Sequence, residues 1–127
     1  MSVAYLDTHA AVWLHDGLVE KLSEEARRQI EGNDLLISPM VLVEMQYLFD
    51  RKRVAARPLE IYRHLHGTFA VNLCSFPFPA IAIEALGCAW TNDPFDRLIV
   101  AQAKANGNAV LVTADNKIRK NYRAAMW

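Results

Sequence analysis

The chain has 127 residues, of which 53% are hydrophobic and 22% are charged. At roughly 100–200 residues per domain, this length predicts one domain over residues 1–127 and leaves no room for a multidomain protein. Lysine plus arginine and aspartate plus glutamate each number 14, so the net charge is zero and indicates no partner by itself. The hydrophobic content is too high for a disordered chain.

The charges are unevenly distributed along the chain. Residues 1–50 hold nine acids and three bases, whereas residues 51–127 hold five acids and eleven bases. This distribution permits an acidic centre flanked by basic surface, which suits a polyanion handled through metal ions. Scattered, solvated surface charges are the alternative interpretation.

The sequence carries no sign of export or of membrane insertion. Cys74 and Cys88 are the only cysteines and form no CxxC pair, and the amino terminus has no signal-like pattern before Asp7. No apolar run approaches the roughly 18 residues that a membrane helix requires. We therefore expect a cytoplasmic protein with reduced thiols and no membrane partner.

Predicted strands and helices alternate along the chain. Short apolar runs predict buried strands, and capping residues followed by helical spacing predict helices. In chain order, the expected elements are a strand at 3–6, a helix beginning near Thr8, a helix from Ser23 to Gly32, a strand at 35–37, a helix beginning at Ser38-Pro39, a helix at 58–66, a strand in the alternating segment 69–73, a helix at 79–86, a helix from Asp93-Pro94 to Gly107 and a strand at 109–113. This order predicts an α/β fold with a parallel sheet covered on both faces, and it disfavours sandwiches and helix bundles.

Five isolated glycines punctuate these elements. Each follows a possible helix, so each is expected to adopt the left-handed conformation that ends helices; they stand at positions 17, 32, 67, 87 and 107. The sequence has no GxGxxG and no GxxxxGK[ST] motif. A dinucleotide site and a P-loop phosphate site therefore have no support.

Four acids are placed where a parallel sheet binds its ligands. Asp7 ends the first predicted strand and Asp115 follows the last, while Glu44 and Asp96 lie just inside helices that begin at Pro39 and Pro94. In open parallel sheets, ligands bind beyond the carboxyl ends of the strands. We therefore expect these four carboxylates to converge on one rim.

Such a cluster favours divalent-metal chemistry. Carboxylates without histidine or cysteine ligands suit Mg²⁺ or Mn²⁺, and they suit metal-activated attack of water on a phosphodiester. Without cations, the acids repel one another and raise each other's pKa. Structural roles are the alternatives: helix capping for Asp7 and Asp93, a helix-dipole contact for Asp96, and a turn at Asp115.

Four blocks of this sequence resemble the PIN domain superfamily, and within it the VapC-type toxins of bacterial toxin–antitoxin pairs. The resemblance spans most of the chain, and its third block is the most specific. The blocks are Tyr5-Leu6-Asp7-Thr8-His9-Ala10 with Trp13-Leu14, Ile37-Ser38-Pro39 through Glu44-Met45, Asp93-Pro94-Phe95-Asp96-Arg97-Leu98-Ile99-Val100-Ala101-Gln102-Ala103, and Leu111-Val112-Thr113-Ala114-Asp115. Many relatives carry His-Arg just before the third block, where this chain has Thr91-Asn92.

The resemblance implies a three-layer α/β/α fold with a mainly parallel five-stranded sheet. It also implies an endoribonuclease dependent on Mg²⁺ or Mn²⁺, a homodimer, and a cognate VapB-like antitoxin that blocks the site. Carried over by motif position, the catalytic and metal-binding residues are Asp7, Glu44 and Asp96, with Asp115 as a more variable fourth, Asp93 as an accessory acid, and Thr8 and Thr113 as hydroxyl neighbours.

Candidate RNA contacts and interfaces are less specific. Basic residues that suit an RNA backbone are Arg51, Lys52, Arg53 and Arg57 after the Glu44 helix, and Lys117, Arg119, Lys120 and Arg123 near the carboxyl end. Arg97 is expected to pair with a local acid, and the four histidines show no pairing that would support metal-free catalysis. Large apolar side chains beyond the needs of a small core favour an interface; they are Trp13, Tyr47, Phe49, Tyr62, Phe76 and Phe78.

Three other functions compete with the toxin hypothesis. A phosphoacceptor receiver domain has a similar length and topology, but it needs paired acids near the first strand and a Lys-Pro that this chain lacks. A PIN module without catalysis, binding only RNA or protein, is disfavoured by the intact acids. A PIN nuclease of RNA maturation fits the same residues as a toxin.

Overall fold

A computed structural model describes residues 2–127, which fold around one five-stranded sheet. Its strands lie in the order β3-β2-β1-β4-β5, and all four neighbouring pairs are parallel. The strands are β1 (Val3–Leu6), β2 (Asp34–Ile37), β3 (Asn72–Leu73), β4 (Val110–Val112) and β5 (Ala125–Met126). Because β1 is central, both of its faces are buried.

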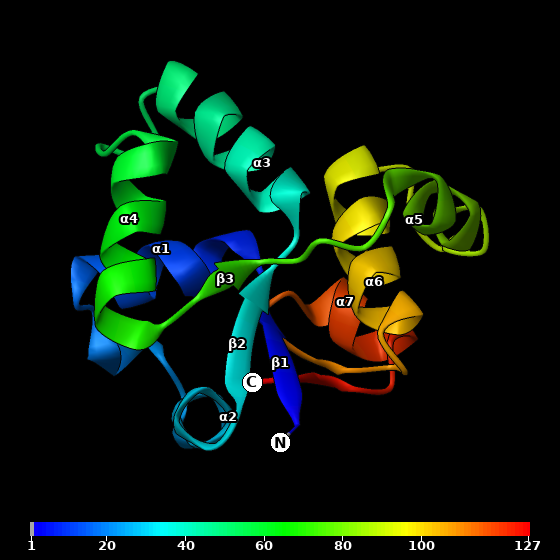
Figure 1. The fold of residues 1–127 in the computed structure, drawn as a ribbon, viewed down its shortest axis with the longest axis horizontal. Helices are drawn as coiled ribbons and strands as arrows, with labels where there is room; N and C mark the ends of the chain where they lie inside the picture. Colours follow the sequence, from blue (N-terminus) through cyan, green and yellow to red (C-terminus); the bar gives the residue numbers. More distant parts are fainter. Residues whose placement is uncertain (1) are drawn as a thin grey trace.

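Helices cover the sheet on both sides. The helices are α1 (Thr8–Asp16), the 3-10 turn η1 (Val19–Lys21), α2 (Glu24–Gly32), α3 (Pro39–Asp50), α4 (Pro58–Phe69), α5 (Phe78–Ala85), α6 (Pro94–Ala105) and α7 (Asn116–Asn121). Figure 1 shows α1, α2 and α4 on one side of the sheet, α5, α6 and α7 on the other, and α3 at the top. The predicted three-layer α/β fold with a parallel five-stranded sheet is confirmed.

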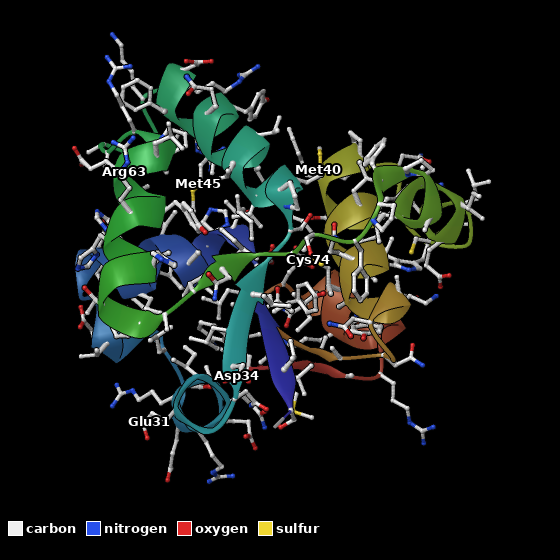
Figure 2. All side chains as sticks on the ribbon, viewed as in Figure 1. Glu31, Asp34, Met40, Met45, Arg63 and Cys74 are labelled. Atoms are coloured by element: carbon white, nitrogen blue, oxygen red, sulfur yellow. The ribbon has the colours of Figure 1, made fainter. Side chains whose placement is uncertain are left out.

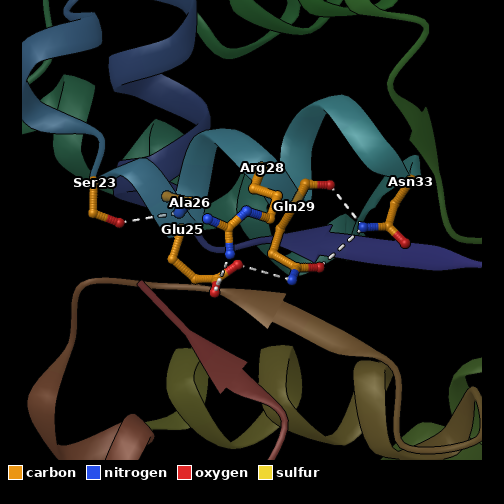
Figure 3. Close-up of polar contacts among 6 residues, drawn as sticks. All are labelled: Ser23, Glu25, Ala26, Arg28, Gln29 and Asn33. Carbon is orange, nitrogen blue, oxygen red and sulfur yellow. Dashed lines mark hydrogen bonds and ion pairs between the residues drawn. The ribbon is translucent and has the colours of Figure 1, made fainter.

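Local sequence explains where the helices begin. Ser23 Oγ accepts a hydrogen bond from the Ala26 amide at 3.0 Å and caps α2, and Asn33 Nδ2 donates to the Gln29 carbonyl at its end (Figure 3). Both α3 and α6 place proline in their first turn after a capping residue, where a missing amide costs nothing. These starts match the predicted ones.

The core is apolar and continuous across the layers. Strand side chains such as Leu6 and Leu111 are fully buried, and so are Val41 and Met45 of α3. Met45 points between α3 and α4 in Figure 2. Burying these side chains fixes α3 against the sheet, which in turn sets the place of Glu44, the residue before Met45.

The segment 69–73 and three glycines depart from the expectations. Phe69 ends α4, and only Asn72 and Leu73 pair with β2, because the helix continues past Gly67 to a left-handed cap at Ala70. Gly17 and Gly107 do have positive φ, whereas Gly32, Gly67 and Gly87 do not. Within residues 2–127, no helix is long and apolar enough to cross a membrane.

Candidate active site

The structure brings the four predicted acids together around one cavity of about 390 Å³. Asp7 follows β1 directly, Asp115 follows β4, Glu44 lies in the second turn of α3, and Asp96 lies in the first turn of α6. Asp93, His9 and Trp13 also line this cavity. The convergence arises because parallel strands end at the same edge of the sheet and each following helix begins there.

Asp7 is the most firmly held acid. Its side chain is only 8% exposed, yet Oδ1 accepts a hydrogen bond from the Thr8 amide at 2.8 Å and Oδ2 accepts one from Thr113 Oγ1 at 2.6 Å. Burial raises the pKa of Asp7, and these two hydrogen bonds oppose that rise. Thr113 Oγ1 also accepts the Asp115 amide at 3.1 Å, so one hydroxyl connects two acids of the cavity.

Glu44 is held from α1. The Thr8 hydroxyl donates a hydrogen bond to Glu44 Oε1, which ties the second turn of α3 to the first residue of α1. Burial raises the pKa of Glu44, and the negative charges of Asp7, Asp93 and Asp115 raise it further. Thr8 and Thr113 therefore lie beside the acids as the two predicted hydroxyl neighbours.

Asp96 differs from the other acids in its lack of support. Within residues 2–127, its carboxylate accepts no hydrogen bond and forms no ion pair. Burial first, and then the charges of Asp93, Asp7, Asp115 and Glu44, raise its pKa to about 7. A cation placed in the cavity would stabilise the charged form of Asp96 and lower its pKa.

Asp93 and Asp115 both cap helices; the cap at Asp93 is the predicted structural role, whereas Asp115 begins α7 instead of the predicted turn. Asp93 Oδ1 accepts the amides of Phe95 at 2.8 Å and Asp96 at 3.2 Å, and Asp115 Oδ1 accepts the Ile118 amide at 2.9 Å. Each carboxylate has a second oxygen beyond these bonds. Capping therefore does not prevent either acid from facing the cavity that both line.

A buried polar contact that the sequence did not indicate fixes α3 relative to α6. Ser38 Oγ, which caps α3, donates to Gln102 Oε1 of α6 at 3.0 Å, and both residues are almost fully buried. The rings of Tyr47 and Phe95 pack between the same helices. In the sequence, the only sign of this contact is the polar residue Gln102 within an apolar run. This contact sets the position of Glu44 relative to Asp96.

The donor set fits a hard divalent cation. Carboxylate oxygens from Asp7, Glu44, Asp96 and Asp115 are the ligands that Mg²⁺ and Mn²⁺ prefer. Burial is the main cause that raises the pKa values of Asp7, Glu44 and Asp96, and the charges of neighbouring acids raise them further, so a cation in the cavity would stabilise their charged forms. Over residues 2–127, no three His, Cys, Asp or Glu side chains lie close enough to hold an ion by themselves. A cation here would complete its shell with water and substrate phosphate, as Mg²⁺ usually does.

The predicted basic residues lie on two exposed segments. The Arg51 guanidinium stands 4.7 Å from the centre of the Tyr47 ring, and Lys52 and Arg53 follow it in the turn after α3. The second group, Lys117, Arg119 and Lys120, lies on α7, which Asp115 caps.

One expectation about basic side chains is wrong. Within residues 2–127, Arg97 pairs with no acid; it donates to the carbonyl oxygens of Thr91 at 2.6 Å and Ala85 at 3.4 Å. Two of the histidines lie side by side, with the Nδ1 atoms of His15 and His64 2.8 Å apart. Neither ring lines the cavity of the acids.

Comparison with known proteins identifies the family of this chain. A family model described as the PIN domain matches residues 4–124. The chain belongs to the PIN domain family. The match covers all four acids of the cavity and the two threonines that hydrogen-bond to them, and it confirms the family inferred from the four sequence blocks.

Relatives of this PIN domain include a curated protein and two solved structures. The chain is 28% identical to Ribonuclease VapC22 of Mycobacterium tuberculosis over 123 residues, which are 95% of this chain and 93% of that protein. It resembles VapBC2 from Rickettsia felis bound to a promoter DNA fragment (TM-score 0.60, 20% identity) and DNA-bound VapBC from Salmonella typhimurium (TM-score 0.60, 18% identity). Each of the two structural comparisons covers 98% of this chain and 96% of the other chain. The predicted VapC-type resemblance is confirmed.

Proposed function

We propose that this PIN domain is an endoribonuclease dependent on Mg²⁺ or Mn²⁺ that acts as the toxin of a toxin–antitoxin pair. The observation that carries the proposal is the single cavity into which four separate segments bring Asp7, Glu44, Asp96 and Asp115. Ribonuclease VapC22 supports the reaction class, because it matches this chain over nearly its whole length.

Each acid has its own part in this proposal. Asp7, Glu44 and Asp96 would hold the cation together with water and substrate phosphate, and Asp115 would assist from the carboxyl end of β4. Thr113 and Thr8 orient Asp7 and Glu44 through the hydrogen bonds described above. When bound, Mg²⁺ or Mn²⁺ supplies Lewis acidity toward the phosphodiester and activates the attacking water. Asp93 holds the first turn of α6, and with it Asp96, toward the cavity.

The partners in this proposal are RNA, a VapB-like antitoxin and a second copy of the chain. The two solved VapBC structures support an antitoxin partner, since their toxin chains share this fold. Exposed apolar side chains on α3 and α5 support protein interfaces, because water-facing surface of this kind is costly when left uncovered. They include Val43, Tyr47, Phe78 and Ile83.

The test is cleavage of an end-labelled pool of structured RNA by the purified protein. We expect cuts with Mg²⁺ or Mn²⁺, none with EDTA, and none with Asp7→Asn or Asp96→Asn at matched protein concentration. Arg28→Gln on α2 is the control, since Arg28 is exposed and pairs only with Glu25. Cuts that persist in EDTA or in both aspartate variants would contradict the proposal.

Co-expression separates a toxin from an RNA-processing nuclease. A toxin arrests growth when expressed alone, and a small protein encoded beside it relieves the arrest. A processing nuclease is expected to show neither effect. A folded protein that binds RNA but never cleaves it would favour a binding module.

A further inference from the structure

A second cavity of about 360 Å³ adjoins the cavity of the acids. The two cavities share His9 and Trp13, which line both of them. The rest of the second cavity is lined by residues of α1, of α3 and of the segments that follow these two helices. Its volume lies within the roughly 300–1,000 Å³ of sites that take small molecules or single groups of a larger ligand.

The chemistry of this second cavity differs from that of its neighbour. Its rim carries the exposed cations Lys21 and Arg53, and its floor includes the buried side chain of Leu48. One acid, Asp16, also lines it, and the carboxylate of Asp16 lies 4.0 Å from His15 Nε2. Bases therefore outnumber acids here, whereas acids dominate the adjoining cavity.

Aromatic rings mark the boundary between the two cavities. The centres of the His9 and Trp13 rings are 5.8 Å apart, and the centre of the Trp127 ring lies 5.6 Å from that of Trp13. Lys21 Nζ lies 5.3 Å from the centre of the Trp13 ring. His9 is exposed and Trp13 is half-buried, so both present ring surface toward the cavities.

We propose that the second cavity holds a nucleotide of single-stranded RNA next to the scissile phosphate. This inference rests on the proposed function, because it treats the acidic cavity as the place of cleavage. The base of that nucleotide packs against His9 and Trp13, and its phosphate lies between Lys21 and Arg53. Aromatic surface flanked by cations is how proteins hold single strands with little sequence preference.

The arrangement favours RNA over a protein segment as the occupant. A phosphodiester needs cations on its flanking phosphates, and the nearest acids repel that backbone unless a cation neutralises them. Lys21 and Arg53 supply positive charge in the second cavity, beside the cavity where the four acids supply negative charge. The aromatic boundary then places one base beyond the bond that is cut.

The first test compares Lys21→Gln/Arg53→Gln with wild type in Mg²⁺, using a single-stranded RNA that wild type cleaves. We expect KM to rise at least tenfold with kcat nearly unchanged, because these side chains bind the flanking phosphate rather than the reacting one. Arg28→Gln, which removes an exposed cation elsewhere, is expected to leave both constants unchanged. Thermal melts confirm that each variant folds.

The second test measures binding of the same RNA in EDTA, where the proposed function predicts no cleavage. Each phosphate contact contributes about −0.7 to the slope of log K against log salt for a single strand. Loss of the contact to this one phosphate should reduce the magnitude of that slope by about 0.7 in the double variant. RNA should also quench the tryptophan fluorescence of Trp90→Phe, whose missing ring lines neither cavity. It should quench that of Trp13→Phe less, because the ring proposed to contact the base is gone.

The outcomes separate the two proposals. If wild type cleaves no RNA, or cleaves it in EDTA, the proposed function fails. If wild type cleaves with Mg²⁺ but the double variant keeps its KM and its salt slope, the second cavity does not hold RNA and this inference is overturned. Weaker binding of a protein partner with unchanged RNA affinity would overturn it in the same way.

Discussion

The two walls of the acidic cavity are built differently. On the wall formed by β1 and β4, Asp7 and Asp115 are joined through the Thr113 hydroxyl and carry further hydrogen bonds from backbone amides. On the wall formed by α3 and α6, Glu44 accepts one hydroxyl donor, and Asp96 accepts none within residues 2–127.

This difference shows how a cavity of buried acids can keep its geometry before a cation binds there. On the strand wall, burial still raises the pKa of Asp7, but two fixed donors oppose that rise and hold the carboxylate in place. The helix wall leaves Asp96 dependent on a proton or an added cation, and the pKa of about 7 reflects that dependence. We therefore expect variants of the two walls to behave differently.

Removing the Asp7 charge should have the largest effect. Asp7→Asn keeps the shape and one acceptor oxygen but takes away a charge at the centre of the donor set. We expect activity and Mn²⁺ affinity to fall by more than the roughly 10–100-fold that follows loss of an outer hydrogen-bond partner. RNA cleavage and calorimetric Mn²⁺ titration measure this, and undiminished Mn²⁺ binding would show that the strand wall holds no cation.

Thr113→Val tests the hydrogen bonds of the strand wall. It removes the donor to Asp7 and leaves the Asp115 amide without its acceptor, in a fully buried position. We expect a loss of about 1–3 kcal/mol in the free energy of unfolding and about 10–100-fold in activity. Urea unfolding and cleavage rates measure both. Thr113→Ser keeps the hydroxyl and should restore most of each; equal losses in the two variants would refute the orienting role.

Asp96 tests the helix wall through pH. The pKa of Asp96 is about 7 in the folded protein and near 3.8 when unfolded. Between these two pH values, the folded state therefore binds the proton of Asp96 more tightly than the unfolded state does. The stability from this group is present below about pH 4 and is lost as pH rises through about 7. Metal-free wild type should therefore lose stability over this range, and Asp96→Asn should lose less. Urea unfolding in EDTA measures this, and identical pH profiles would contradict it.

The smallest expected effect separates the capping role of Asp93 from its charge. Asp93→Asn retains a good N-cap, so the free energy of unfolding should hardly change, whereas Asp93→Ala should cost about 1 kcal/mol. Activity should fall modestly in Asp93→Asn if the charge assists the site. Equal destabilisation in both variants, measured by thermal melts, would show that the cap is not what Asp93 contributes.

Much of this site could be predicted from the sequence because its parts are local. Asp7 directly follows an apolar strand, Asp115 lies three residues after another, and Asp96 lies two residues after the proline that begins α6. Local patterns of this kind place a residue at the carboxyl edge of a parallel sheet without knowledge of distant contacts. The same reasoning located most of the helices to within a few residues.

The rest depends on contacts between distant segments. The Ser38–Gln102 hydrogen bond joins residues 64 positions apart, and no local pattern indicates it. The strand β5 has only two residues, Ala125 and Met126, which pair with β4 at the end of the chain. The second cavity likewise combines Lys21 and Arg53 from separate turns.

The most direct test of the central claim is the chemistry of the cleaved ends. In the proposed reaction, a water activated by a cation at the four acids would leave 5′-phosphate and 3′-hydroxyl ends, and these should form with Mg²⁺ and disappear in EDTA. End-specific ligation and mass spectrometry of the fragments distinguish the products. Cyclic 2′,3′-phosphate ends that persist in EDTA would show that the carboxylates do not carry the reaction.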